Sequence, residues 1–219
     1  MTSHGNNSDL TSGLAAQSNA SGEAVAELYD TWAASGDYDA DLDMWGYEAP
    51  QHIAELTLAA LAAVPGEVLD AGCGTGKVGT SLHERGVRHV LGGDFSPASI
   101  KAARARNVYT AVEHLDLNNP LGHVDARFAA TTSAGVFSYL SNTEATIREL
   151  LRVVLAGGSV LFTQRTDLWA ERDCDAIIER LVADDVCDAA VSEPMPYLPG
   201  HPDFTDSIGI RYVTLVKRL

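Results

Sequence analysis

The stretch VLDAGCGTGKVG, residues 68–79, is an apolar run that ends in an acid and leads into four glycines within eight positions. Because glycine has no Cβ, such a turn lets backbone N–H groups approach a ligand closely. The stretch therefore predicts a ligand-binding turn after a strand. It leaves open whether the ligand is the phosphates of a nucleotide, the diphosphate of a dinucleotide, or a group that is not a phosphate.

Strand-like and helix-like segments alternate after this turn, which predicts a doubly wound α/β fold. The expected strands lie near residues 67–72, 88–94, 109–115, 128–135, 159–165, 187–193 and 207–217. The expected helices lie near residues 23–35, 50–64, 77–85, 97–106, 142–155 and 166–184. Two strands in succession at the end predict a terminal hairpin, so we expect a seven-stranded Rossmann-like sheet with one antiparallel terminal strand.

The chain before residue 65 predicts a helical cap that covers this sheet. Two helices are expected there, joined by a short loop rich in Gly, Asp and Tyr, and a turn at 156–158 is expected before the fifth strand. The polar segment 1–21 has no apolar run of the kind found in signal peptides, so we expect a disordered tail. We thus expect a single domain over residues 22–219, with a helical lid over 22–64 and an α/β core over 65–219.

Composition limits the function classes. A net charge of −15 argues against nucleic-acid partners and against anionic membranes, because both are bound through Lys and Arg. No stretch approaches 18 consecutive apolar residues, so no membrane span is expected. The three cysteines lack the paired spacing of a zinc site, so we expect no metal and free thiols in the cytoplasm.

Two phosphate-binding motifs can be compared with the glycine turn. The P-loop motif fails because Ala71 and Val78 stand where it needs Gly and Ser or Thr. The segment GTGKVG is a literal dinucleotide-binding G-x-G-x-x-G, and Asp94 follows Gly74 by 20 residues, where an acid that binds ribose is expected. The dinucleotide interpretation therefore remains open on spacing alone.

Electrostatics favours a different ligand. Asp70 ends the strand just before the turn, and a carboxylate there repels an incoming diphosphate where little water screens the pair. A ligand with an ammonium and a sulfonium group is attracted instead. S-Adenosylmethionine is such a ligand, and its ribose also needs the second acid, Asp94.

These residues carry a family resemblance. VLDAGCGTG followed by GGDFSPASI resembles the class I S-adenosylmethionine-dependent methyltransferases, from about residue 22 to the C-terminus. The upstream segment YDTWAASGDYDADLDMWGYEAP is similar to the lead-in of the Williams–Beuren-region methyltransferase-like proteins. Two features depart from the family pattern, because Phe128–Ala129 replaces an aromatic–acid pair and AGG replaces Pro-Gly-Gly before the fifth strand.

The resemblance implies roles for individual residues. The glycine turn would pass under the methionine moiety, with Asp70 near its amino group and Asp94 on the ribose hydroxyls. Phe95, Asp116 and Leu117 would meet the adenine, and Ser133 would lie near the methyl group. Tyr29 and Tyr38 would close over the cofactor. The implied cofactor-binding residues are Tyr29, Tyr38, Asp70, Gly72, Cys73, Gly74, Gly76, Asp94, Phe95, Asp116, Leu117 and Ser133.

Simpler structural roles stand beside several of these assignments. Asp94 could cap the next helix, Asp116 could form an Asx turn, and Tyr29 could pack within its helix. His201, in a Pro- and Gly-rich loop, is a candidate catalytic base or a solvated histidine. Arg165, at the carboxyl edge of the fifth strand, is a candidate for binding an anionic substrate, or it pairs with Asp167.

The sequence therefore predicts methyl transfer from S-adenosylmethionine to an O or N atom of a small-molecule acceptor that it does not identify. One alternative is an NAD-dependent short-chain dehydrogenase, although no tyrosine has the lysine four residues on which that class requires. Another is a non-catalytic protein that binds S-adenosylmethionine or S-adenosylhomocysteine. The sequence does not indicate an oligomeric state.

Overall fold

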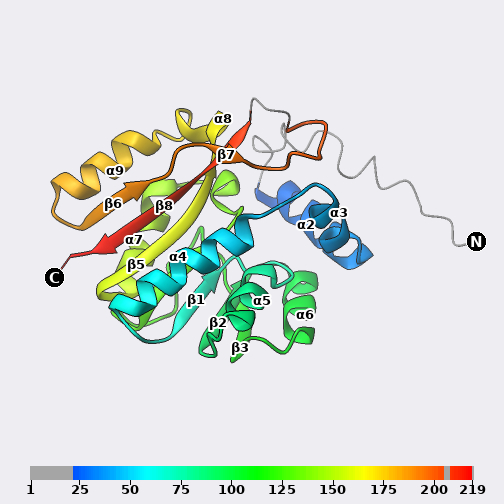
Figure 1. The fold of residues 1–219 in the computed structure, drawn as a ribbon, viewed down its shortest axis with the longest axis horizontal. Coiled ribbons are helices and arrows are strands. Elements are labelled where there is room, and N and C mark those ends of the chain that lie inside the picture. The colour runs from blue at the N-terminus through cyan, green and yellow to red at the C-terminus, as the bar shows by residue number, and fades with distance from the viewer. Residues whose placement is uncertain (1–21, 205–207, 219) are drawn as a thin grey trace, which may run out of the picture.

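The computed structural model describes residues 22–204 and 208–218. The expected disordered tail, residues 1–21, lies outside this part of the chain. Within it, helices pack against a sheet of eight strands in the order β3-β2-β1-β4-β5-β8-β6, with β7 paired to β8 (Figure 1). The strands are β1 Val68–Ala71, β2 Val90–Asp94, β3 Ala111–His114, β4 Phe128–Ser133, β5 Val154–Arg165, β6 Cys187–Val191, β7 Met195–Pro196 and β8 Gly209–Lys217.

The first five strands pair in parallel, and β8 pairs antiparallel with both β5 and β6. The expected Rossmann-like α/β fold with an antiparallel terminal strand is therefore confirmed. The sheet has one strand more than expected, because the two-residue β7 adds to the edge of β8. The parallel order places the carboxyl ends of β1, β2 and β4 side by side, and open sheets of this type bind ligands at that edge.

Helices cover both faces of the sheet. Those before and among the parallel strands are α2 Gly22–Ser35, α3 Tyr38–Met44, α4 Ala49–Ala63, α5 Lys77–Glu84 and α6 Pro97–Ala105. The later ones are the 3-10 turn η2 Phe137–Tyr139, α7 Thr143–Val153, α8 Thr166–Trp169 and α9 Cys174–Ala183. Ser96 caps α6 as expected, since its hydroxyl accepts a hydrogen bond from the Ser99 N–H at 3.1 Å and Pro97 is the first helical residue.

Two apolar cores hold these layers together. On one face, α7 and α9 pack buried leucines and isoleucines against β4 and β5, where Phe137 and Phe162 stack at 4.0 Å. On the other face, α4 and α5 pack against β1 with Ile53 and Leu82 fully buried, and the N-terminal segment adds Trp32. Figure 1 shows α2 and α3 side by side at the end of the molecule away from the C-terminus, near α5 and α6.

Three local expectations were wrong. The segment expected as a loop before Pro50 contains helix α3. The turn expected at 156–158 lies inside β5, because the pairing of β4 shifts from Val154 to Ser159 and the intervening residues bulge out. The helix expected over 166–184 is split into α8 and α9, where Asp173 takes a left-handed conformation with φ 53°.

Candidate functional site

A cavity of about 400 Å³ opens at the carboxyl ends of β1, β2 and β4, and we call it the cleft. Its volume is in the range of small-molecule sites, about 300–1,000 Å³. Seven of the predicted cofactor residues line the cleft, namely Tyr38, Gly72, Gly74, Asp94, Phe95, Asp116 and Leu117. The structure thus brings together residues from four separate segments of the sequence.

Asp94 is fixed on the wall of the cleft. One carboxylate oxygen accepts a hydrogen bond from the Gly74 N–H at 2.8 Å, and the other accepts one from the Ser96 N–H at 2.9 Å. Burial raises the pKa of Asp94, while these backbone bonds act to lower it. A carboxylate offers about four acceptor positions, so each oxygen retains capacity for a ligand hydroxyl. Ser96, and not Asp94, is the cap of α6.

Asp70 lies beneath the glycine turn and does not line the cleft. Its side chain is fully buried, and its oxygens accept hydrogen bonds from the Tyr109 hydroxyl at 2.7 Å and the Thr132 hydroxyl at 3.0 Å. Burial raises the pKa of Asp70 to about 6, although these two hydrogen bonds act to lower it. The sequence analysis expected the Asp70 carboxylate near the amino group of a ligand. In the structure the carboxylate lies below the glycine turn, and the backbone of the turn separates it from the cleft.

Tyr109 was missed by the sequence analysis, and it explains the last glycine of GTGKVG. Its hydroxyl accepts a hydrogen bond from the Gly79 N–H at 3.1 Å, and a Cβ at Gly79 would lie 2.1 Å from the tyrosine Cζ. Gly79 is thus required by Tyr109 and not by a ligand. The last glycine of the dinucleotide-binding motif also serves close helix packing, so the G-x-G-x-x-G match leaves the choice of ligand to the charge of Asp70.

The glycine turn itself needs residues without a Cβ at its left-handed positions. Gly74 has φ 53° and a Cβ there would point into open space, while Gly76 has φ 96° and would meet Arg106 Cδ at 2.9 Å. Cys73 lies between Gly72 and Gly74 and is 6% exposed, and burial raises the pKa of its thiol. The Cys73 thiol is therefore kept protonated, and its contact with the cofactor stays a prediction.

A smaller cavity of about 60 Å³ adjoins the cleft, and we call it the aromatic pocket. It shares residues such as Tyr38, Thr75 and Tyr139 with the cleft. Its aromatic lining is Trp32, Tyr38, Tyr47, Tyr139, Tyr197 and Phe204. Burial raises the pKa of Tyr38, Tyr47 and Tyr197, and no Asp, Glu or His is among the described residues that line the pocket.

The loop that carries Tyr139 is held from below by Arg172. The guanidinium donates to the carbonyl oxygens of Ser138, at 3.0 Å, and of Leu140. Leu140 and Tyr139 both line the cleft. Arg172 therefore fixes one wall of the site from the α8–α9 connection, and nothing in its local sequence indicated this role.

The predicted catalytic base and the predicted substrate-binding residue do not line either cavity. His201 is 4% exposed, and its ring packs against those of Trp45, at 4.4 Å, and Phe204. Arg165 makes a two-point ion pair with Asp167, with nitrogen–oxygen distances of 3.0 and 2.5 Å. Pairing with Asp167 was the alternative considered for Arg165, and the catalytic role of His201 stays a prediction.

Three cofactor predictions have mixed outcomes. Ser133 is fully buried at the end of β4 and does not line the cleft, whereas the next two residues, Ala134 and Gly135, do. Asp116 both lines the cleft and forms the Asx turn, because it accepts a hydrogen bond from the Asn118 N–H at 2.9 Å. Tyr29 lies in α2, but its side chain is outside the described part of the structure.

The sequence matches one family model. Residues 68–158 match the model described as "Methyltransferase domain". A curated relative, malonyl-[acyl-carrier protein] O-methyltransferase of Serratia marcescens, is 34% identical over 146 residues, which are 64% of this chain and 52% of the relative. The chain thus spans about half the length of that relative.

Solved structures resemble the fold. One is a putative S-adenosylmethionine-dependent methyltransferase from Methanococcus maripaludis, with a TM-score of 0.63 and 14% identity over 87% of this chain and 94% of that one. Another is the putative methyltransferase in a complex with the Haloferax volcanii activator Trm112, with a TM-score of 0.60 and 19% identity over 87% of this chain and 98% of that one. These matches extend the fold assignment from the core to nearly the whole described chain.

Among the described residues, no helix has the length and apolar character needed to cross a bilayer. In the same residues, no three or more His, Cys, Asp or Glu side chains are grouped so that they could hold a metal ion.

Proposed function

We propose that this chain, whose residues 68–158 match a methyltransferase-domain model, is a class I S-adenosylmethionine-dependent methyltransferase that binds S-adenosylmethionine in the cleft and transfers its methyl group to an O or N atom of a small molecule. The geometry of Asp94 carries the proposal. Its carboxylate is oriented by two backbone N–H groups and retains acceptor positions toward the cleft, as two adjacent ribose hydroxyls require. Apolar walls for the adenine lie next to it, at Phe95, Leu115 and Leu117.

The residues of the glycine turn fit the other end of this cofactor. Gly74 leaves open space where a side chain would project, so a ligand chain fits against the backbone there. Asp70 lies below with its pKa near 6 and is mostly ionised at pH 7. A buried negative charge at this position supports a ligand that ends in a cation and opposes a diphosphate.

The cofactor supplies an activated methyl group on a positively charged sulfur when it is bound. The chain's own contribution is to position the acceptor and to exclude water, because displacement at the methyl carbon depends on alignment. The aromatic pocket adjoins the cleft at Tyr38 and Tyr139, so it is where we expect the acceptor. With no acidic or imidazole group in its described lining, the pocket favours an acceptor that is nucleophilic without a protein base.

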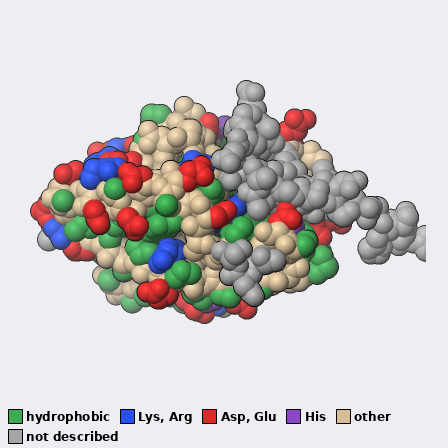
Figure 2. Space-filling view, turned by 90° about the horizontal axis from the view of Figure 1, so that it is seen from above, with side chains coloured by type: hydrophobic (Ala, Val, Ile, Leu, Met, Phe, Trp, Pro, Cys, Tyr) green, Lys and Arg blue, Asp and Glu red, His purple; other side chains and the backbone are tan. Residues whose placement is uncertain are grey.

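The charge of the chain favours a neutral or cationic small molecule. Residues 22–48 contain eight acids and no Lys or Arg. Figure 2 shows acidic side chains spread over the face seen from above, with few basic ones among them. The curated relative is named for O-methylation, which supports oxygen as one of the two acceptor atoms considered.

Calorimetric titration tests the proposal. S-Adenosylmethionine and S-adenosylhomocysteine are titrated into the wild type, Asp94→Asn and the matched surface variant Asp125→Asn. We expect binding by the wild type and Asp125→Asn, and a loss of at least about tenfold in affinity for Asp94→Asn, since the site is then left with an amide donor facing ribose donors. Equal binding by all three proteins would contradict the assignment of the site.

Two further measurements separate the alternatives. Enhancement of NADH fluorescence by the wild type would support the dehydrogenase, which the comparisons do not favour. Binding of S-adenosylmethionine without turnover on a panel of amines, phenols and carboxylic acids would support a non-catalytic binding protein. Formation of S-adenosylhomocysteine with any acceptor supports the methyltransferase.

A further inference from the structure

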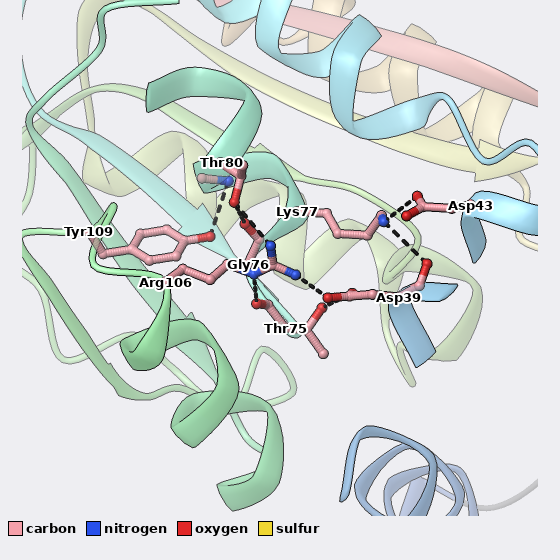
Figure 3. A network of polar contacts seen from close by, with 9 residues as sticks. Asp39, Asp43, Thr75, Gly76, Lys77, Thr80, Arg106 and Tyr109 are labelled. Atoms are coloured by element: carbon pink, nitrogen blue, oxygen red, sulfur yellow. Dashed lines mark hydrogen bonds and ion pairs between the residues drawn. The ribbon is translucent and has the colours of Figure 1, made fainter. Parts of the chain in front are cut away.

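A network of polar contacts joins the lid helix α3 to the glycine turn and to the end of α6 (Figure 3). Its centre is Arg106, the residue that follows α6. The guanidinium forms an ion pair with the Asp39 carboxylate and donates through Nε to the Thr75 carbonyl oxygen at 2.5 Å. A third contact reaches the Thr80 hydroxyl at 3.3 Å. Arg106 thus links three segments that are far apart in the sequence.

Thr75 is held on both its main chain and its side chain. Its carbonyl accepts from Arg106, and its hydroxyl donates to the other Asp39 oxygen at 2.6 Å. Thr75 lines both the cleft and the aromatic pocket, whereas neither Asp39 nor Arg106 lines them. The Asp39–Arg106 pair therefore sets the position of a residue of the site without touching the ligand space.

Two other lid carboxylates are paired with the same region. Asp43 accepts from the Lys77 ammonium at 2.6 Å, next to the glycine turn. Asp30, in α2, accepts from the Ser96 hydroxyl at 2.6 Å and from the Ala98 N–H at 3.0 Å, just after Asp94. The lid is thus attached to the chain beside both cofactor motifs.

Helix α3 has little stability of its own. It is seven residues long, and an isolated helix of that length is marginal in water. Its last turn contains no basic residue and ends near Asp43, whose charge is unfavourable at a helix C-terminus. Pairing of Asp43 with Lys77 offsets this penalty only when the helix is docked.

Docking of α3 also places Tyr38. This residue precedes Asp39 and lines both cavities, and its ring packs edge to face on Trp32 at 4.5 Å. Movement of Asp39 away from Arg106 would therefore open the site at Tyr38. The contacts of Asp39 that hold α3 therefore also position Tyr38 and Thr75, which line the site.

We propose that Asp39 and Arg106 are positioning residues that hold α3 closed over the glycine turn, and that this latch sets the affinity for the cofactor and slows its release. The proposal rests on the proposed function for the identity of the ligand. Side-chain exposures of 37% and 26% for Asp39 and Arg106 leave the pair open to screening by salt. Cofactor affinity should therefore fall with ionic strength more steeply with the latch than without it.

The test compares two ion pairs by double-mutant cycles. The latch cycle uses Asp39→Asn, Arg106→Met and the double variant. The control cycle uses Glu55→Gln, Arg85→Met and their double variant, because the Glu55–Arg85 pair at 3.4 Å joins α4 to the end of α5 and involves neither α2 nor α3. Asp43→Asn provides a milder latch variant, since the Asp43 side chain is 69% exposed. Thermal melting checks that each variant folds.

Three readouts are measured on the full chain. We expect amide hydrogen exchange in α3 without added ligand to be about tenfold faster in both single latch variants. The Kd for S-adenosylhomocysteine at 50 mM KCl should rise about tenfold, with most of the change in the dissociation rate, and the difference from the wild type should shrink at 1 M KCl. The double latch variant should be no weaker than either single variant, and the control variants should match the wild type.

The outcomes distinguish this proposal from the assignment of the cofactor. If the wild type binds no S-adenosylhomocysteine but α3 exchanges faster in the latch variants, the docking role stands and the cofactor assignment fails. If the wild type binds and the latch variants bind equally well with unchanged exchange in α3, the latch is overturned. Additive effects of Asp39→Asn and Arg106→Met would also overturn it, because residues that act as a pair are not additive.

Discussion

Replacing Gly79 with Ala tests whether Tyr109 is the reason for the last glycine of the turn. Gly79 lies in α5, and an alanine there would by helix propensity alone stabilise the protein by about 1 kcal/mol. The added Cβ, however, would lie 2.1 Å from Tyr109 Cζ and 2.3 Å from its hydroxyl oxygen. The tyrosine ring must therefore move, and the two effects have opposite signs.

The size of the steric effect follows from what the ring holds. Overpacking in a filled core costs about 1–3 kcal/mol. A displaced Tyr109 also loses its 2.7 Å hydrogen bond to buried Asp70, and bonds to charged groups are worth about 1.5–3 kcal/mol. After subtraction of the propensity gain, we expect Gly79→Ala to lower the free energy of unfolding by about 3 kcal/mol. For a chain of this size that is a fall of about 6–12 °C in Tm.

Urea unfolding and thermal melting measure this change. Gly122→Ala is the matched control, because a Cβ at Gly122 meets no atom within 4 Å. We expect the control to stay within about 1 kcal/mol of the wild type. A Gly79→Ala protein as stable as Gly122→Ala would refute the assignment of Gly79 to Tyr109.

Three further results are expected. Asp94→Asn should weaken S-adenosylhomocysteine binding at least about tenfold by calorimetry, because its amide nitrogen is a donor that faces the ribose donors. Arg172→Met should leave the Ser138 and Leu140 carbonyls without this donor and lower the affinity for S-adenosylhomocysteine several-fold. Arg172→Lys should keep part of that affinity, because lysine can still donate to one carbonyl. The contribution of Asp70 to stability, measured as wild type against Asp70→Asn, should be lost as pH rises from about 4 through 6. Its pKa is raised from 3.8 to about 6, so the folded state binds more protons in that interval, and the change is about 3 kcal/mol.

The features that the sequence predicted well are local. The glycine turn follows β1, Asp94 is the last residue of β2, and Asp116 lies just after β3, so their place at one edge of the sheet comes from parallel topology alone. Strand and helix periodicity predicted the layers for the same reason. Each of these inferences needs only residues that are close in the sequence and a fold with known geometry.

The features that were missed depend on distant partners. Helix α3 looked like a loop because its acids favour no regular structure locally, and its partners Thr75, Lys77 and Arg106 lie 34 to 67 residues away. Arg172 was missed for the same reason, because the Leu140 and Ser138 carbonyls that it contacts lie 32 and 34 residues before it. The local sequence indicates the helix or strand in which a residue lies, whereas a distant side-chain partner is not revealed by periodicity.

A second background tests the Gly79 prediction by removing the tyrosine ring. In a Tyr109→Leu background, Gly79→Ala should cost nothing and should add up to about 1 kcal/mol of helix propensity, because the clash is gone. In the dinucleotide-binding motif too, the last glycine serves close packing of helix on strand, and the second glycine is the one that approaches the diphosphate. The result at Gly79 therefore tests packing, and the choice of ligand rests on the charge of Asp70. The Tyr109 hydroxyl donates to Asp70 beneath the turn and accepts from the Gly79 N–H, so Gly79, Tyr109 and Asp70 form one hydrogen-bonded group. This group holds the negative charge of Asp70 below the glycine turn, and that charge favours a cationic ligand over a phosphate.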